Sequence, residues 1–201
     1  MPLIPRPAPT AGATRASSSA FLRFSLPFLL LFAAATAGAA EITGLVVNVA
    51  DGDTVTVLDS SHARHKVRLE GIDAPERHQA FGARSKQHLE ALVQDRNVIV
   101  IWHKRDRYGR ILGRVLAPEC ERGACPITLD TGLAQLNAGL AWPYKQYARE
   151  QGPEARTRYA AAEQAARSKQ EGLWHDANPV PPWDFRRASR NAGTVRTTRS
   201  M

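Results

Sequence analysis

The chain lacks most of the features of a membrane protein or a cysteine-rich protein. Its longest apolar run, Phe24–Ala35, has 12 residues and is interrupted by Ser25 and Pro27, whereas roughly 20 residues are needed to span a bilayer comfortably. It has only two cysteines and no internal repeat. Charged residues make up 23% of the chain and hydrophobic residues 43%, which excludes a wholly disordered acidic or basic polymer. The 201 residues therefore predict one globular domain with appendages, or at most two small domains.

The central part of the chain also lacks a net charge. The formal net charge is +8, but residues 1–40 hold three arginines and no acid, and residues 186–201 hold five arginines and no acid. The remaining residues, 41–185, hold 19 basic and 19 acidic side chains. A basic protein is a candidate for binding nucleic acid or another anionic surface. Here the excess lies entirely in the two ends, so the positions of the charges in the body matter more than their number.

The first 40 residues are typical of an export signal. Arg23 lies just before the apolar run, and the small residues at 35–39 after it offer cleavage sites. We therefore predict a cleaved signal peptide over residues 1–40 and an exported protein, periplasmic or extracellular, with no stable membrane association after cleavage. The alternative is an uncleaved segment that anchors the chain in a membrane.

The two cysteines, Cys120 and Cys125, are separated by four residues that include Gly123. In an oxidising compartment this spacing favours a small disulfide loop, with the glycine at the turn, over free thiols. A metal site is a weaker interpretation because no histidine or further cysteine lies near them in the sequence.

The C-terminal residues 177–201 are rich in proline and arginine. Pro179, Pro181 and Pro182 interrupt regular structure, and no apolar periodicity follows Phe185. We therefore predict a disordered basic tail. It either adds non-specific affinity for polyanions or is a solvated segment without a specific role.

The body between these ends has the patterns of a mixed domain. Alternating and β-branched residues predict strands over 42–49, 54–58, 64–69, 97–102 and 111–116. Apolar residues at helical spacing predict helices over 82–94, 129–138 and 153–171. Short strands followed by helices indicate an α+β fold. A small closed barrel would cover the edges of so short a sheet, so the expected architecture is a five-stranded OB-fold-like β-barrel with three α-helices.

Acidic residues lie beside turns at the ends of the predicted strands. Two such carboxylates, Asp53 and Asp73, repel each other when brought together unless a cation or a shared proton intervenes. Oxygen ligands suit a hard ion such as Ca²⁺ or Mg²⁺. Glu76 follows Asp73 by three residues, close enough to lie beside the ion and activate a water molecule. The alternative for the Asp51-Gly52-Asp53 segment is a purely structural hairpin turn.

Two arginines, Arg68 and Arg110, complete this set. Their planar guanidinium groups match the oxygens of a phosphate. A metal, a carboxylate base and two arginines can together promote attack on a phosphodiester, because the cations stabilise charge on the phosphoryl oxygens and the base generates the nucleophile. The alternative is that both arginines pair with surface acids.

Several longer motifs follow one another along the chain. They are Val-Ala-Asp-Gly-Asp-Thr-Val at 49–55, Val-Arg-Leu-Glu-Gly-Ile-Asp-Ala-Pro-Glu at 67–76 and Asp-Arg-Tyr-Gly-Arg-Ile-Leu-Gly at 106–113. Leu-Asn-Ala-Gly-Leu-Ala-Trp-Pro-Tyr at 136–144 and Ser-Lys-Gln-Glu-Gly-Leu-Trp at 168–174 come next. In these motifs and their order, the sequence resembles the staphylococcal nuclease (thermonuclease) family over residues 42–175.

The resemblance implies a metal site and a base. Asp53 and Asp73 match the calcium-binding aspartates of the family, and the main-chain carbonyl of Ala74 matches a third ligand. Asp51 matches an acid that lies near the metal, next to these ligands, without binding the metal itself. Glu76 matches the glutamate that acts as general base.

The resemblance also implies a substrate site. Arg68 and Arg110 match the phosphate-binding arginines of the family, and Arg107 and Tyr108 match a pair that contacts a terminal phosphate of a bound nucleotide. Two aromatic residues would flank the nucleotide pocket or, alternatively, pack in the core or at its rim: Trp142 and Tyr144.

The function that these observations predict is a secreted, monomeric, Ca²⁺-dependent endonuclease with a catalytic domain over residues 41–176. It would hydrolyse DNA, RNA or both, and the resemblance implies products with 3′-phosphate and 5′-hydroxyl ends. The alternative is a catalytically weak or inactive nucleic-acid-binding module of the same fold. Such a module would be expected to lack some of the motif carboxylates or arginines, and all of them are present here.

Overall fold

The structure is a computed structural model that describes residues 39–120, 123–146 and 151–198, with side chains described up to Asn191. The predicted signal peptide lies almost entirely outside these residues. Among the described helices, none is both long enough and apolar enough to cross a membrane.

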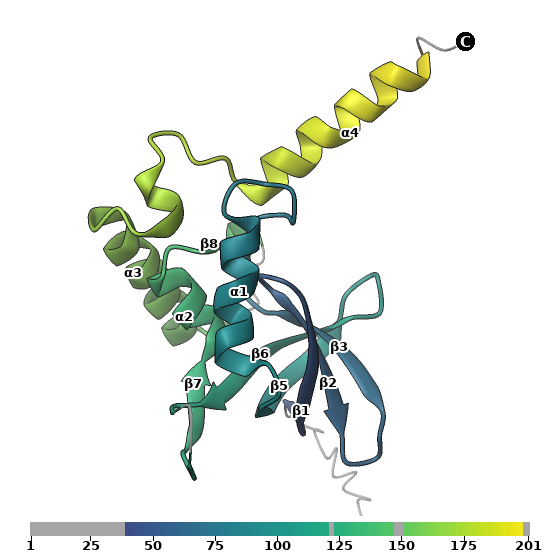
Figure 1. The fold of residues 1–201 in the computed structure, drawn as a ribbon, viewed down its shortest axis with the longest axis vertical. Coiled ribbons are helices and arrows are strands. Elements are labelled where there is room, and N and C mark those ends of the chain that lie inside the picture. Colours follow the sequence, from purple (N-terminus) through teal and green to yellow (C-terminus); the bar gives the residue numbers. More distant parts are fainter. Residues whose placement is uncertain (1–38, 121–122, 147–150, 199–201) are drawn as a thin grey trace, which may run out of the picture. The chain divides into compact units, whose positions relative to one another are not determined.

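The centre of the fold is a sheet of six strands: β1 (Ala40–Asp51), β2 (Thr54–Asp59), β3 (Arg64–Leu69), β5 (Asn97–Arg105), β6 (Ile111–Pro118) and β7 (Ile127–Asp130). Their order in the sheet is β3-β2-β1-β5-β6-β7 (Figure 1). A parallel pairing between β3 and β6 brings Val67 opposite Ile111 and closes the first five strands into a barrel. The α+β fold and its five-stranded barrel are therefore confirmed.

Alternation of side chains explains why these segments form a barrel. In β6 the buried residues Ile111, Val115 and Ala117 alternate with partly exposed ones, as expected of a strand with one face in the core. Between β1 and β2 the register shifts at Val46/Asn48 and again at Val49/Asp51. Irregularities of this kind bend a strand and increase its twist, which helps a short sheet to curl closed.

Within the described residues, the α-helices α1 (Gly82–Val93), α2 (Thr131–Asn137), α3 (Pro153–Ser168) and α4 (Pro182–Thr198) and the 3-10 helix η2 (Gly172–His175) accompany the barrel. Leu89 and Val93 of α1 are fully buried in the barrel core. Figure 1 shows α2 and α3 next to each other beside the barrel. The hydroxyl of Tyr159 in α3 donates to the carboxylate of Asp130 at 2.9 Å, which ties these helices together.

Two helix boundaries differ from the prediction by more than one residue. The helix expected over 129–138 begins later, because Leu129 still belongs to β7 and Asp130 is the residue that caps α2. Its carboxylate accepts the backbone N–H of Leu133 at 3.0 Å. Helix α3 ends at Ser168 rather than at 171, because Gln170 and Gly172 both adopt positive φ angles that a helix cannot contain.

Helix α4 is a further difference from the prediction, which expected a disordered tail after Phe185. The helix begins with Pro182, a residue tolerated in the first turn, and has Asp184 in that turn, where a negative charge is favourable. Trp183 packs against a small apolar cluster that contains Trp142, Leu173 and Trp174. This packing holds the start of α4 against the rest of the domain. Pro182 and Trp183, which begin and anchor the helix, come before Phe185, the residue after which the sequence has no apolar periodicity.

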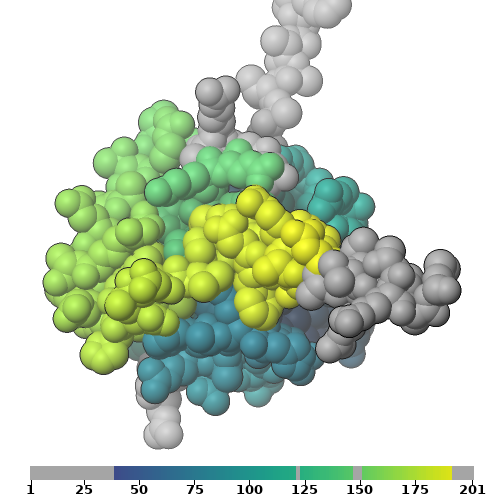
Figure 2. Space-filling model, turned by 90° about the horizontal axis from the view of Figure 1, so that it is seen from above, coloured from purple at the N-terminus to yellow at the C-terminus, as the bar shows by residue number. Residues whose placement is uncertain are grey.

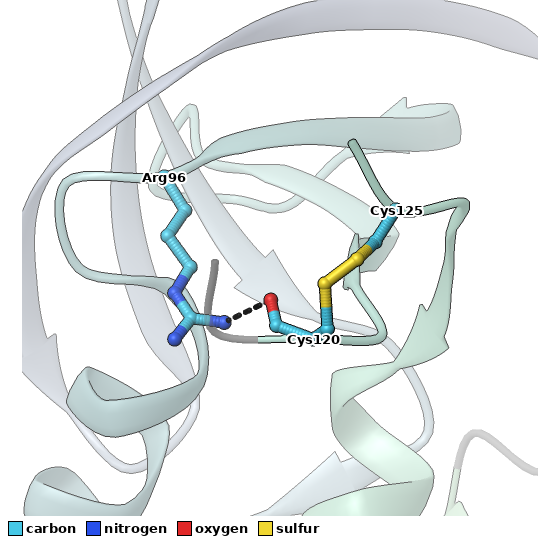
Figure 3. The surroundings of a disulfide bond; sticks show 3 residues. All are labelled: Arg96, Cys120 and Cys125. Carbon is cyan, nitrogen blue, oxygen red and sulfur yellow. Dashed lines mark hydrogen bonds between the residues drawn. A yellow bond between two sulfur atoms is a disulfide. The ribbon is translucent and has the colours of Figure 1, made fainter. Parts of the chain in front are cut away.

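The two cysteines form a disulfide in the connection between β6 and β7. Cys120 and Cys125 are bonded, with their Cα atoms 6.0 Å apart, within the usual range for a disulfide. The guanidinium of Arg96 donates to the carbonyl of Cys120 at 3.3 Å and ties the loop to the chain before β5 (Figure 3). The predicted disulfide is therefore present in the structure.

Candidate active site

The Asp51-Gly52-Asp53 segment forms the turn between β1 and β2 and rests on a buried polar network. The side-chain amide of Gln135 in α2, which is fully buried, donates to the carbonyls of Gly52 at 2.6 Å and Ser85 at 2.9 Å. A β-carbon at Gly52 would overlap the side chain of Ser85, so glycine is required by this close approach. The network fixes the acidic turn against α1 and α2.

One arginine joins the two aspartates of the predicted metal site. Nη2 of Arg68 donates to Oδ2 of Asp53 at 3.1 Å and to Oδ1 of Asp73 at 2.7 Å. The backbone N–H of Ala74 donates to the same oxygen of Asp53 at 3.0 Å. Both aspartates are buried, with 6% and 1% of their surfaces exposed. The fold thus brings together four residues, of which Asp53 and Ala74 are 21 positions apart in the sequence.

Two short paired strands position Asp73. It lies in β4 (Ile72–Asp73), which pairs with β8 (Trp142–Pro143) so that Asp73 is opposite Trp142. The backbone N–H of Tyr144 donates to the carbonyl of Gly71 at 2.8 Å and extends this pairing. The backbone that carries the Asp73 carboxylate is therefore fixed by main-chain pairing with β8 and Tyr144.

Burial and mutual repulsion make this cluster receptive to a cation. Burial, followed by the nearby charge of Asp53, raises the pKa of Asp51 to about 6. Burial also raises the pKa of Asp73, although hydrogen bonds from Arg186 and the charge of Arg68 oppose the rise. Burial by itself would lower the pKa of Arg68, but the charges of Asp53 and Asp73 raise it. A positive charge placed among these acids is stabilised.

Glu76 lies at the start of the loop before α1, beside Asp73. The backbone N–H of Gln79 donates to the carbonyl of Glu76 at 2.9 Å, and a β-carbon at Gly82 would overlap that carbonyl, so the loop folds back tightly. The Glu76 carboxylate is paired with Arg186 of α4, at 2.7 Å from its Nη1 atom. The same nitrogen contacts Asp73 at 3.1 Å, so Nη1 of Arg186 bridges the carboxylates of Asp73 and Glu76.

Arg110 lies on the same outer face of the barrel as Arg68. Its neighbour Ile111 is opposite Val67 in the β3–β6 pair, and both of these side chains point into the core, so the alternation directs the two arginines outward. Nε of Arg110 donates to the carboxylate of Asp106 at 2.7 Å. In the structure as described, its ion pair is with Asp106 and not with the carboxylates of the site.

Arg107 and Tyr108 lie at the tip of the β5–β6 turn. Tyr108 is 68% exposed. The guanidinium of Arg107 lies 4.9 Å from the centre of its ring, and that of Arg110 lies 5.6 Å from it. An exposed ring with two cations beside it suits contact with an anionic, aromatic ligand.

The two predicted nucleotide-pocket aromatics have different surroundings. The guanidinium of Arg68 lies 5.5 Å from the ring of Tyr144, which places this tyrosine at the site. Its ring also stacks on that of Trp183, at 6.1 Å and an interplanar angle of 16°. Trp142 is 3% exposed and makes edge contacts with Trp174 and Trp183. For Trp142 the structure supports the packing alternative.

Sequence analysis missed three residues of the site: Gln135, Trp183 and Arg186. Gln135 interrupts the apolar face of α2 between Leu133 and Leu136, and a buried polar residue at such a position is a signal of a specific hydrogen bond. The signal for Trp183 and Arg186 is the helix start at Pro182. Nothing in the sequence pairs Arg186 with Asp73, which lies 113 positions away.

The residues present suit a hard divalent cation. Asp53, Asp73 and the main-chain carbonyl of Ala74 offer oxygen ligands of the kind that Ca²⁺ and Mg²⁺ prefer. Across the described ranges, no three side chains of histidine, cysteine, aspartate or glutamate converge as a metal centre. A cation here would therefore depend on two carboxylates, a main-chain carbonyl and water.

The comparison with protein families agrees with this geometry. The family model described as "Staphylococcal nuclease homologue" matches residues 66–176, which include Arg68, Asp73, Glu76 and Arg110. The chain belongs to this family. Its nucleases are metal-dependent in general, and membership supports an endonuclease, a hydrolase that acts on nucleic acid. Arg186 and the rest of α4 lie beyond the residues that this model matches.

Individual proteins of other sources resemble most of the chain. An "Uncharacterized endonuclease" of Escherichia coli is 38% identical over 165 residues, which are 82% of this chain and 98% of the relative. "Protein ParB" of Escherichia coli is 41% identical over 175 residues, 87% of this chain and 95% of the relative. A "Micrococcal nuclease" of Shigella flexneri is 40% identical over 153 residues, 76% of this chain and 85% of the relative.

Proposed function

We propose that this chain is an exported, Ca²⁺-dependent endonuclease that acts as a monomer on DNA, RNA or both and leaves 3′-phosphate and 5′-hydroxyl ends. One observation carries the proposal. The carboxylates of Asp53, Asp73 and Glu76 meet at one end of the barrel, within hydrogen-bond distance of two guanidinium groups, those of Arg68 and Arg186. The names of the relatives from Escherichia coli and Shigella flexneri support nuclease activity.

In the proposed reaction, Glu76 is the general base. Its carboxylate removes a proton from a water molecule, and the resulting hydroxide attacks the phosphorus in line with the 5′-oxygen. A new P–O bond forms, the bond from phosphorus to the 5′-oxygen breaks, and the 5′-oxygen takes a proton from solvent. The phosphate stays on the 3′-oxygen of the other fragment.

Arg68 and Arg110 stabilise the charge that develops on the phosphoryl oxygens. Both point outward from the same face of the barrel, and their guanidinium groups can donate in pairs to phosphate. Asp53, Asp73 and the Ala74 carbonyl would hold the divalent cation, which supplies a further positive charge beside the phosphate. The oxygen-only donor set and the family resemblance support Ca²⁺.

Substrate contacts beyond the phosphate that is cleaved come from two tyrosines, the exposed Tyr108 and the partly exposed Tyr144. Tyr108, with Arg107 and Arg110 beside its ring, would contact a terminal phosphate. Tyr144 lies against Arg68 and presents a ring on which a base can stack without regard to sequence.

The substitution Glu76→Gln tests the base. It should lower the cleavage rate by about 10²–10⁴-fold, the usual contribution of general-base catalysis, while Ca²⁺ and nucleotide still bind. Glu90→Gln is a matched control, because Glu90 pairs with Lys86 on the surface of α1, and this variant should cleave normally. Near-normal cleavage of labelled DNA and RNA by Glu76→Gln would reject the assignment.

A chelator tests the metal. It should abolish cleavage of both substrates, and added Ca²⁺ should restore it better than Mg²⁺. End-group analysis of the products should find 3′-phosphates and 5′-hydroxyls. Full activity in chelator would exclude a metal role, and binding without any cleavage would favour the alternative of a nucleic-acid-binding module.

Export is the remaining part of the proposal. The disulfide between Cys120 and Cys125 supports it, because disulfides persist in oxidising compartments. N-terminal sequencing of the protein from the producing cell should find a mature end near residue 40. An intact N-terminus in the membrane fraction would indicate an anchored protein instead.

A further inference from the structure

Arg186 of α4 forms ion pairs with two acids of the site, Asp73 and Glu76. Its Nη1 and Nη2 atoms donate to the two oxygens of Asp73, at 3.1 and 2.6 Å, and Nη1 also donates to Glu76 at 2.7 Å. Burial would lower the pKa of Arg186, but its hydrogen bonds with Asp73 and Glu76 raise it. Both oxygens of a predicted metal ligand and one oxygen of the predicted base are therefore engaged by one side chain.

Trp183, one turn before Arg186, covers the aromatic part of the same site. It stacks on Tyr144, the ring that the proposed function assigns to a nucleic-acid base. Just before the helix, the side-chain amide of Gln79 donates to the carbonyl of Val180 at 2.5 Å and joins the α4 segment to the loop that carries Glu76. The start of α4 lies across this face between the loop before α1 and the chain around β8 (Figure 2).

Resting on the proposed function, we infer that α4 is a built-in inhibitor, in which Arg186 takes the place of the divalent cation and Trp183 takes the place of a substrate base. The two contacts come from one helical turn and cover two different parts of the site. A single movement of the start of α4 would open both. The active form is then the one in which a cation has displaced Arg186.

Arg186 and a divalent cation cannot bind the Asp73 carboxylate at the same time. Asp73 is 1% exposed, and its Oδ1 atom already accepts from Arg68 as well as from Arg186. A cation bound to this carboxylate would meet the positive guanidinium of Arg186 at direct contact distance, where like charges repel strongly. The apparent affinity for the cation is accordingly lowered by the fraction of molecules in which α4 has opened.

Titration of the full chain with CaCl₂ by isothermal calorimetry tests this competition. Arg186→Gln removes the charge and should lower the apparent Kd for Ca²⁺ by about tenfold, which corresponds to a closed form that is about ten times as populated as the open form. Arg187→Gln is the matched control. Arg187 is the next residue, is 69% exposed and pairs with Asp184, so this variant should bind Ca²⁺ as the unaltered chain does.

A second substitution tests the aromatic contact. Trp183→Ala should increase the affinity for a short single-stranded DNA in the absence of Ca²⁺ by several-fold, because it frees the ring of Tyr144. Thermal unfolding of each variant verifies that the fold is retained.

Four outcomes distinguish a failure of the inhibition by α4 from a failure of the proposed function. An Arg186→Gln variant that binds Ca²⁺ more tightly, and that cleaves DNA at lower Ca²⁺, supports inhibition. An unchanged Kd, with cleavage in every variant, overturns the inference and leaves the proposed function standing. Loss of cleavage by Arg186→Gln at saturating Ca²⁺ has the same consequence, because Arg186 would then act on the phosphate of the substrate. If no variant binds Ca²⁺ or cleaves, the proposed function itself fails.

Discussion

Replacing Gln135 with leucine would test how the acidic turn is held in place. Leucine removes the side-chain amide, whose nitrogen donates to the carbonyls of Gly52 and Ser85. The amide oxygen, which is hydrogen-bonded to Nδ1 of His88 at 2.6 Å, is lost as well. Leaving a buried carbonyl such as that of Gly52 without a donor costs about 1–3 kcal/mol, and each net hydrogen bond contributes about 0.5–1.5 kcal/mol. We therefore expect the free energy of unfolding to fall by about 2–4 kcal/mol, which lowers Tm by roughly 5–15 °C in a domain of this size.

Urea unfolding followed by circular dichroism would measure the loss, as a lower midpoint with an unchanged slope. Because Gly52 lies between Asp51 and Asp53, the same variant should bind Ca²⁺ more weakly. Gln94→Leu is the control, since the Gln94 amide bonds Asp95 at the surface, and a surface change of this kind should stay within about 0.5 kcal/mol. If Gln135→Leu and Gln94→Leu have the same stability and Ca²⁺ affinity, the network does not support the turn.

Two further predictions concern stability away from the site. Replacing Cys120 and Cys125 together with serine should lower the free energy of unfolding by about 2 kcal/mol, because the disulfide closes only a short loop, and it should leave cleavage unchanged; equal urea midpoints with and without the disulfide would contradict this. The hydrogen bond with His65, followed by that with Ser61, lowers the pKa of Asp59 in the folded state. The folded pKa is then below the unfolded one, so the stability it contributes is present above about pH 4 and is lost as the pH falls. Asp59→Asn should flatten the acid limb of the stability curve, and an acid limb as steep as that of the unaltered chain would refute the assignment.

The local patterns were sufficient to predict the barrel and most of the site. β-branched alternation marked β2, and β3 followed as its return strand after a turn. The spacing of five and three residues among Arg68, Asp73 and Glu76 was readable because β3, the short strand β4 and the loop after it follow one another directly along the chain. Short-range spacing of this kind survives folding almost unchanged. Asp53 joined them because it directly precedes β2, whose first residue, Thr54, pairs with Arg68 in the antiparallel β2–β3 hairpin, and that hairpin is also a local feature.

Other parts of the site depend on long-range contacts that no local pattern contains. The role of Trp142 was ambiguous in sequence, since an aromatic residue before Tyr144 suits both a pocket wall and a core. Burial by Trp174 and Trp183, from two later segments, favours packing. The N-terminus of α2 was misplaced by two residues, because Leu129 satisfies a helical pattern while β6 offers it a strand partner.

The net charge shows most clearly which features the sequence determines and which depend on the tertiary structure. By itself, the sequence determined that the basic excess lies in the two ends. It also determined that residues 41–185, which have no net charge, carry three motif carboxylates and two arginines at specific spacings. It also determined the strands, because alternation and β-branching act within a few residues. Only the tertiary structure decided that one of the tail arginines, Arg186, lies on Asp73 and Glu76. A pairing over more than 100 positions depends on the path of every element between them, and no spacing along the chain specifies that path.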